Sequence, residues 1–243
     1  MKDLDKKRLV GIILGALLVL AMGVKFYLDY KENNNTIEKI ATADAKKFKK
    51  EYEDLNGTTA YGEIKYKDLK ISEYIPVVYK TDKEIVNILN NGTGVIYFGF
   101  NSCPWCRSMV ETLLKVIEDY EVENFYYTDI KHIRSSFKVE NKKLVETKGT
   151  ESYYDILEKL DGYLTDYVIT DNNKDYDTNE KRLYAPTVVV VKEGEILGVH
   201  EVTVDSQTNP FDGLNDTQKE ELYGIYEEMI KKLDENTCSK AGC

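Results

Sequence analysis

The chain has 243 residues, a formal net charge of −10 and 42% hydrophobic residues with only 4 prolines, which is typical of a folded protein with one core. The negative charge, and the lack of a basic stripe or a glycine-rich phosphate loop, argue against nucleic acid as a partner. His132 and His200 lie far apart in the sequence and give little basis for a metal site, so we expect neither a metal nor a cofactor.

The first 30 residues are expected to address the protein to a membrane. A basic cluster precedes an apolar stretch of about 20 residues, which is long enough to span a bilayer once. The positive-inside rule then predicts a cytoplasmic N-terminus and an extracytoplasmic domain. The alternative is a cleaved signal peptide and a secreted protein, because residues 21–23 resemble a cleavage site. In both cases the domain lies where disulfides persist, which fits the even count of 4 cysteines.

Residues 31–74 are expected to form a stalk helix and a linker. Apolar residues between positions 37 and 55 follow one side of a helix whose other side is charged, and Asn56-Gly57 ends it. Two interpretations remain open: the helix packs on the domain, or it lifts the domain off the bilayer. A short alternating segment follows, and the folded domain is expected over residues 75–236.

A cysteine pair lies between a predicted strand and a predicted helix. Residues 94–99 form an apolar run that indicates a buried strand, and an amphipathic helical pattern follows directly. Cys103 follows two cap-type residues, so we expect it at the helix N-terminus, where the unpaired amides and the helix dipole favour a thiolate. Cys106 begins the apolar face of the helix. We therefore predict that Cys103 is an exposed nucleophile of low pKa and that Cys106 is a shielded resolving thiol.

A C-x-x-C pair can also form half of a zinc site. Such a site needs a second pair of ligands, and the remaining cysteines, Cys238 and Cys243, follow more than 130 residues after Cys106. The position between strand and helix favours a redox pair over a zinc site.

The remaining pattern alternates strands with helices, which predicts an α/β fold with a parallel-centred sheet covered on both faces. We expect strands at 75–79 and 125–130 and a helix at 81–89. The segment from residue 132 to residue 183 is an insertion with a helix at 153–167, whose tyrosines belong to the core or form a wall that faces the substrate. Within this insertion, residues 171–180 read as a polar loop without the ligand spacing of a calcium site.

The C-terminal part begins with a hairpin. A β-branched run at 188–191, a turn at Glu193-Gly194 and a partner strand at 196–202 predict it. Thr217 and Glu220 resemble the capping box of a closing amphipathic helix. The tail, residues 237–243, contains Cys238 and Cys243. This pair either closes a small structural disulfide loop or forms a second redox pair that exchanges with the first.

Two segments resemble the thioredoxin superfamily: YFGFNSCPWC, and Tyr184-Ala185-Pro186-Thr187 followed by VVVVKEGEILGV. The resemblance implies a thioredoxin-like fold with a helical insertion before the cis-proline strand, a cis bond before Pro186, and contact of the Ala185 backbone with substrate. Within the superfamily, the chain is similar to membrane-anchored thioredoxin-like proteins of Gram-positive bacteria, including bacteriocin-transport accessory proteins. Many members of the superfamily carry a buried acid six positions before the first cysteine. Tyr97 occupies that position here, which leaves proton handling at Cys106 open.

The expected function is that of a membrane-anchored, extracytoplasmic thiol–disulfide oxidoreductase. Cys103 attacks a substrate disulfide and Cys106 resolves the mixed disulfide, with protein or peptide thiols and a membrane redox partner as partners. The supporting residues are Pro104, Trp105, Ala185 and Pro186. The alternative is a non-catalytic accessory module that binds an exported peptide or belongs to a secretion machine, with a structural disulfide between Cys103 and Cys106. The direction of electron flow is not readable from the sequence, because potentials in this superfamily range from about −270 to about −120 mV.

Overall fold

The computed structural model describes residues 20, 22–25 and 40–234. The chain divides into two units, Met1–Ile40 and Ala41–Cys243. Most of the expected membrane anchor, and the tail with Cys238 and Cys243, lie outside the described residues. Within the part that the structure describes, no helix combines the length and the apolar character needed to cross a bilayer.

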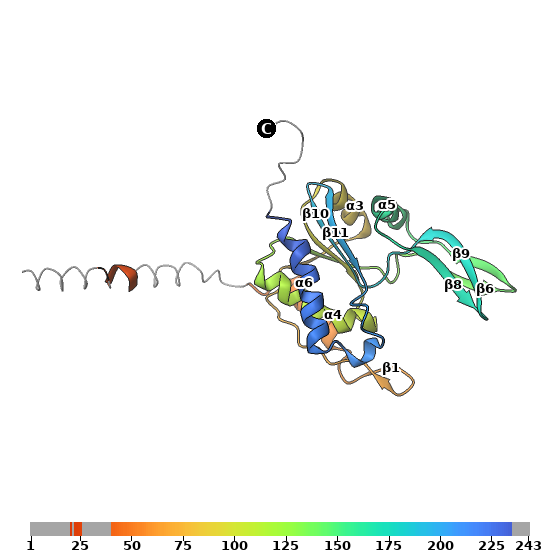
Figure 1. The fold of residues 1–243 in the computed structure, drawn as a ribbon, viewed down its shortest axis with the longest axis horizontal. Helices are drawn as coiled ribbons and strands as arrows, with labels where there is room; N and C mark the ends of the chain where they lie inside the picture. Colours follow the sequence, from red (N-terminus) through yellow and green to blue (C-terminus); the bar gives the residue numbers. More distant parts are fainter. Residues whose placement is uncertain (1–19, 21, 26–39, 235–243) are drawn as a thin grey trace, which may run out of the picture. The chain divides into compact units, whose positions relative to one another are not determined.

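A five-stranded mixed sheet with the order β11-β10-β4-β5-β3 forms the centre of the second unit (Figure 1). Strand β5 is parallel to β3 and β4, whereas β10 is antiparallel to β4 and to β11. The strand that leads to Cys103, β4, is therefore the middle strand. The bounds are Val77–Tyr79 for β3, Gly94–Gly99 for β4, Phe125–Asp129 for β5, Thr187–Lys192 for β10 and Glu195–Glu201 for β11.

Helices cover both faces of this sheet, as the sequence predicts. Along β4 every residue is buried, because Val95 and Tyr97 face one layer of helices while Ile96 and Phe98 face the other. The first layer contains α2 (Ala43–Glu53), α4 (Pro104–Asp119) and α6 (Asp216–Lys231). The second layer contains α3 (Asp82–Asn91) and α5 (Glu151–Leu160).

Helix α2 is part of the domain core. Its residues Ala45, Phe48 and Tyr52 are fully buried. The ring of Phe48 contacts the ring of Tyr127 on β5 edge-on, with 5.0 Å between the ring centroids. Of the two interpretations of this helix, the structure shows the packed one, because the apolar stripe covers the sheet near β3. The domain accordingly begins near Ala41 and not at residue 75, where the sequence analysis places its start.

Capping boxes mark the starts of α3 and α6, and for α6 the predicted cap is wrong. Thr81 caps α3 and forms a capping box with Glu84. Helix α6 begins at Asn215, which forms the capping box with Gln218, so the box predicted at Thr217 is wrong. The short elements of the domain are a hairpin of β1 (Thr59–Tyr61) and β2 (Ile64–Lys65), and the 3₁₀ turn η1 (Pro210–Asp212).

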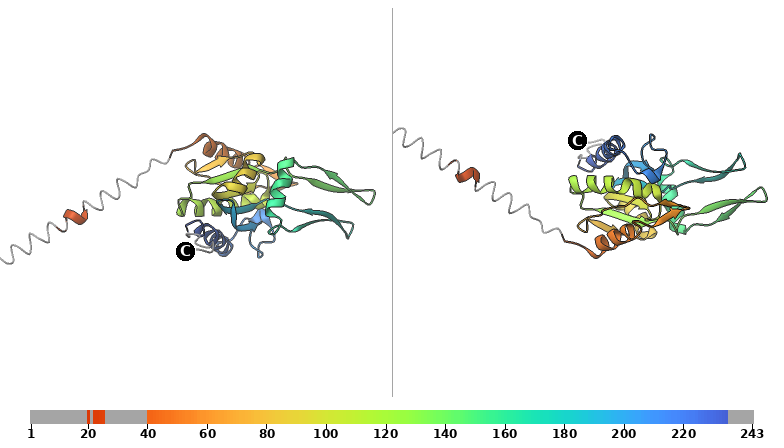
Figure 2. Two further views of the ribbon diagram at one scale, coloured as in Figure 1. Left: turned by 90° about the horizontal axis from the view of Figure 1, so that it is seen from above. Right: turned by 90° about the horizontal axis from the view of Figure 1, so that it is seen from below.

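The insertion forms two hairpins in addition to its predicted helix. Strands β6 (Ser136–Glu140) and β7 (Lys143–Thr147) make the first, and β8 (Asp166–Asp171) and β9 (Lys174–Lys181) make the second. Figure 2 shows both hairpins extending away from the central sheet. They meet through the rings of Phe137 and Tyr167, whose centroids are 5.7 Å apart.

Two predictions for the insertion are therefore wrong in part. The helix ends at Leu160 instead of continuing to residue 167, and the polar segment 171–180 is mostly strand β9. The turn between β8 and β9 is Asn172-Asn173, and both residues have positive φ. Asparagine tolerates this conformation, which two-residue hairpin turns require. The charged side chains of β9 belong to a solvent-exposed hairpin, so the sequence lacks the alternation of apolar and polar residues that predicts a strand.

Candidate redox site

The two cysteines lie where β4 ends and α4 begins. Cys103 is the N-cap of α4, and Pro104 follows in the first turn. The backbone N–H of Cys106 donates to Cys103 Sγ at 3.3 Å, so the sulfur satisfies an amide that has no partner within the helix. The predicted place at the helix N-terminus is confirmed, and the cap is the cysteine itself.

Cys103 is buried, which corrects the prediction that it is exposed. Only 5% of its surface is accessible. Its thiol donates to the carbonyl oxygen of Ala185 at 3.2 Å, and the peptide bond between Ala185 and Pro186 is cis, as expected. Phe100, Trp105 and Ala185 pack on the core cluster that contains the cysteines. The sequence does not reveal this cover, because Ala185 lies 82 positions from Cys103 in the chain.

The pKa values of the two thiols shift in opposite directions. A hydrogen bond from the Cys106 thiol is the main reason that the pKa of Cys103 lies below its ordinary value. Burial opposes this effect, while two backbone amides and the charge of Arg134 support it. Burial, followed by the influence of Cys103, raises the pKa of Cys106 well above its ordinary value. Cys103 is therefore the more acidic thiol, in agreement with the sequence analysis.

Two phenols lie close to Cys106, and one of them, Tyr97, has the position at which the sequence resemblance leads us to expect an acid. Tyr97 and Tyr52 are fully buried, and their hydroxyl groups are 2.8 Å apart. The Phe100 backbone and then Tyr97 lower the pKa of the Cys106 thiol, against the larger effect of burial. Burial raises the pKa of both phenols, so both remain protonated and can donate hydrogen bonds.

The sequence analysis missed Tyr52, because this residue lies on the helix that was expected to be a stalk. Its position on the apolar side of that helix is the only signal for a core role. A further buried phenol, Tyr226 of α6, is within electrostatic reach of Cys106. Its hydroxyl group has no hydrogen-bond partner among the described residues.

Arg107 fixes helix α4, which follows Cys103, to the N-terminal part of the domain. It is the largest fully buried side chain among the described residues. Its guanidinium donates to the carbonyl oxygens of Tyr52 at 2.7 Å and Lys67 at 2.6 Å, and to Oδ1 of Asn56 at 2.9 Å. Arg107 thus joins the end of α2 and the following linker to α4, directly after Cys106. No sequence signal marks it apart from its place next to the cysteine.

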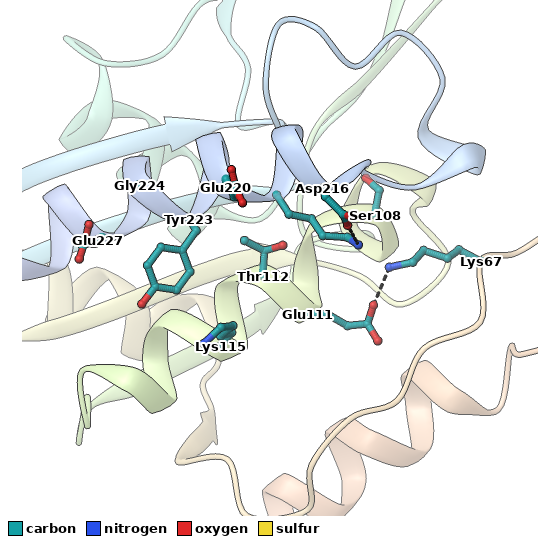
Figure 3. Close-up of a pocket in the computed structure, with 11 residues that line it drawn as sticks. Lys67, Ser108, Glu111, Thr112, Lys115, Asp216, Glu220, Tyr223, Gly224 and Glu227 are labelled. Atoms are coloured by element: carbon teal, nitrogen blue, oxygen red, sulfur yellow. Dashed lines mark hydrogen bonds and ion pairs between the residues drawn. The ribbon is translucent and has the colours of Figure 1, made fainter.

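A separate groove of about 730 Å³ runs between α4 and α6 (Figure 3). Lys67 and Glu111 form an ion pair at 2.6 Å on its wall. Both positive and negative side chains line the groove, and neither Cys103 nor Cys106 lines it. We assign no function to it. The charged lining residues are Lys67, Glu111, Lys115, Asp216, Lys219, Glu220 and Glu227.

The structure brings together most of the site residues that the sequence predicts, whereas Cys238 and Cys243 fall outside the described residues. In the described part of the chain, no group of three or more His, Cys, Asp and Glu side chains is placed to hold a metal ion. His132 is exposed, and Nε2 of His200 lies 2.8 Å from the carbonyl oxygen of Thr203. The residues brought together are Cys103, Pro104, Trp105, Cys106, Ala185 and Pro186.

Comparisons of the chain with protein-family models, with curated proteins and with solved structures give no match. Any assignment of its class therefore rests on the geometry around Cys103 and Cys106.

Proposed function

We propose that the protein is a thiol–disulfide oxidoreductase of the thioredoxin superfamily, held outside the cytoplasm by an N-terminal membrane anchor. The observation that carries this proposal is the placement of Cys103. Its sulfur caps a helix, lies 3.2 Å from the carbonyl oxygen that precedes a cis-proline, and receives a hydrogen bond from the amide of Cys106. Two thiols of unequal acidity in such a place are suited to thiol–disulfide exchange.

The superfamily part of the proposal has support from the sheet and its connections. The redox helix directly follows a central parallel strand, and the cis-proline directly precedes the antiparallel neighbour of that strand. Both features fit the resemblance seen in the sequence. The membrane part of the proposal rests on the basic cluster and the apolar stretch of the first 30 residues.

In the reducing direction, the Cys103 thiolate attacks one sulfur of a substrate disulfide. The substrate S–S bond breaks, a mixed disulfide forms on Cys103, and the first substrate sulfur leaves and takes a proton from solution. Cys106 Sγ then attacks Cys103 Sγ, and its proton passes to the second departing substrate sulfur. The cysteine pair loses two electrons, which reduce the substrate disulfide to two thiols, and the reverse sequence transfers a disulfide to a substrate.

The resolving step requires that Cys106 lose its proton although burial raises its pKa. The Tyr97 hydroxyl is placed to donate to the Cys106 sulfur as negative charge develops, and the Tyr52 hydroxyl lies within hydrogen-bond distance behind it. A donor aimed at a developing charge in a buried site lowers the barrier of a reaction. In this proposal, neutral phenols stabilise the thiolate that an acidic residue would otherwise help to form.

Insulin reduction with dithiothreitol tests the proposal on the full chain in detergent. We expect the protein to accelerate the reaction, and Cys103→Ser to abolish the acceleration. Cys106→Ser should accumulate mixed disulfides through Cys103, because the resolving thiol is missing. A variant that lacks Cys238 and Cys243 shows whether the tail contributes. An unaltered rate in that variant assigns the chemistry to the first pair alone.

A non-catalytic accessory module is the second candidate, and the low exposure of Cys103 favours it. In that function, Cys103 and Cys106 form a structural disulfide, and the protein holds an exported peptide. The same assay separates the two candidates. Lack of insulin reduction, together with a Cys103–Cys106 disulfide that resists dithiothreitol, would favour the binding module and overturn the enzymatic proposal.

A further inference from the structure

Positive side chains from the insertion and the loop before it lie next to the redox site. Lys131 Nζ is 3.3 Å from Oγ of Ser102, the residue before Cys103. The Lys131 ammonium and the Arg134 guanidinium lie 5.8 Å and 5.2 Å from the ring centre of Phe100. The carbonyl oxygen of Phe100 accepts the backbone N–H of Cys103 at 3.1 Å. Both cations are thus held over the loop that carries the reactive sulfur.

Arg134 is half-buried and forms no ion pair within the described part of the chain. Its neighbour Arg182 is buried, donates to the carbonyl oxygen of Ser135 at 2.6 Å and lies 4.3 Å from the ring centre of Tyr167. Burial and then the like charge of Arg182 lower the pKa of Arg134, whereas the Cys103 sulfur raises it. When the Cys103 thiol is ionised, its negative charge therefore offsets part of this positive charge.

Formation of a mixed disulfide removes the negative charge from Cys103. Arg134 then faces an uncharged sulfur, and the repulsion between Arg134 and Arg182 is no longer offset. A carboxylate on the substrate, next to the sulfur that is bound to Cys103, would restore the balance. A guanidinium is well suited to this task, because its planar fork of donors binds a carboxylate through two parallel hydrogen bonds.

We propose that Arg134, together with Lys131, forms a carboxylate subsite for substrate polypeptides that carry Asp or Glu beside the reacting cysteine. This inference rests on the proposed function and names its substrate class. The subsite acts locally, because the net charge of the chain is −10 and repels acidic polypeptides at longer range. Screening limits such interactions to about 8–10 Å at ordinary ionic strength.

A competition between two peptides at equilibrium tests the subsite. The peptides share one sequence, except that glutamates flank the single cysteine in one and glutamines flank it in the other. Full-length Cys106→Ser protein carries one peptide as a mixed disulfide, and the other peptide thiol displaces it from Cys103 Sγ. Thiols and disulfides are conserved, so the ratio of the two mixed disulfides, measured by mass spectrometry, reports only the difference between the peptides.

We expect the glutamate peptide to be favoured roughly three- to tenfold at low salt, and less at high salt. Arg134→Met should bring the ratio close to one, and Arg134→Lys should keep part of the preference. Lys142→Met is the matched control. It removes one positive charge from the turn of the β6–β7 hairpin, at the end away from the central sheet, and should leave the preference intact.

A ratio near one with Arg134 intact, or the same preference in Arg134→Met, would overturn the inference. The intrinsic difference between the two peptide thiols is the same for every variant, so comparison between variants cancels it. The proposed function can fail independently. A peptide preference without insulin reduction would leave the subsite standing and reject the enzyme, and insulin reduction without a preference would do the opposite.

Discussion

At the scale of single residues, the pKa values of two cysteines three positions apart shift in opposite directions, because the surroundings of the two thiols differ. Cys103 caps the helix and accepts hydrogen bonds from the Cys106 thiol and from backbone amides, which favour its thiolate. Cys106 lies in the core, where burial disfavours a charge and the Phe100 backbone and Tyr97 oppose this effect only in part. The proposed nucleophile and the proposed resolving thiol thus differ in environment, although both belong to one short motif.

Alkylation across pH tests this difference. In the reduced protein, the labelling rate of Cys103 by iodoacetamide should rise with pH and reach half its maximum below about 8.5, the ordinary thiol value. Cys106→Ala removes the thiol that donates to Cys103, so the midpoint for Cys103 should move to higher pH. Cys106→Ser is the matched control, because its hydroxyl can still donate. Equal midpoints for both thiols in the unsubstituted protein would contradict the assignment.

A second prediction concerns the phenol beneath Cys106. Tyr97→Phe removes the proposed donor to the Cys106 sulfur and should slow resolution of a mixed disulfide by about 10- to 100-fold, since a hydrogen bond to a charged group contributes about 1.5–3 kcal/mol. Stopped-flow release of the substrate thiol measures this step. Tyr153→Phe is the matched control. It is equally buried but packs in the core cluster on the other face of the sheet. Equal rates in both variants would remove Tyr97 from the mechanism.

At the scale of elements, α2 is a component of the redox site. It supplies Tyr52 to the hydroxyl pair, and Arg107 ties its C-terminal end to the redox helix. An element with this role must remain attached for the site to keep its geometry. Arg107 holds α2 and the following linker to α4 through hydrogen bonds to the carbonyl oxygens of Tyr52 and Lys67 and to the side-chain amide oxygen of Asn56. It forms no ion pair in the described part of the chain.

Arg107→Met should therefore destabilise the domain. The carbonyl oxygens of Tyr52 and Lys67 would lose their donor, and we expect the free energy of unfolding to fall by about 3 kcal/mol. Urea denaturation of the full chain in detergent measures the change. Lys67→Met, which removes only the ion pair with Glu111 near the surface, should cost about 0–1 kcal/mol. A similar loss in both variants would show that the buried hydrogen bonds of Arg107 are not the cause.

At the scale of the whole molecule, the proposed anchor and the redox domain define an orientation across a membrane. The basic cluster precedes the apolar stretch, so the part from residue 41 onwards should lie outside the cell. Protease added to intact cells should remove the domain. Digestion only after the membrane is opened would reverse the orientation. Release of the domain into the medium would instead support a cleaved signal peptide.

Local patterns were sufficient to predict the central part of the fold. The apolar run at Gly94–Gly99, the amphipathic helix after it and the hairpin at Thr187–Glu201 all appear where the sequence places them. Each depends on a period of apolar residues or on a short turn. Neither hairpin of the insertion was predicted, because no residue of β6 or β7 is buried and most side chains of β9 are polar or charged. The start of the domain was misplaced, because an amphipathic helix does not reveal which surface its apolar face covers.

The sequence by itself determined the strand–cysteine–helix order, the position of Cys103 at the helix end and the greater acidity of Cys103 over Cys106. These features depend on residues within a few positions of one another. Only the tertiary structure decided that Ala185 covers Cys103, that Tyr52 meets Tyr97 and that Arg134 lies beside Arg182. Tyr52 and Tyr97 are 45 positions apart in the sequence, and Cys103 and Ala185 are 82 positions apart. Such contacts depend on how the layers pack. Such packing follows from the shape of the assembled core, which no local period records.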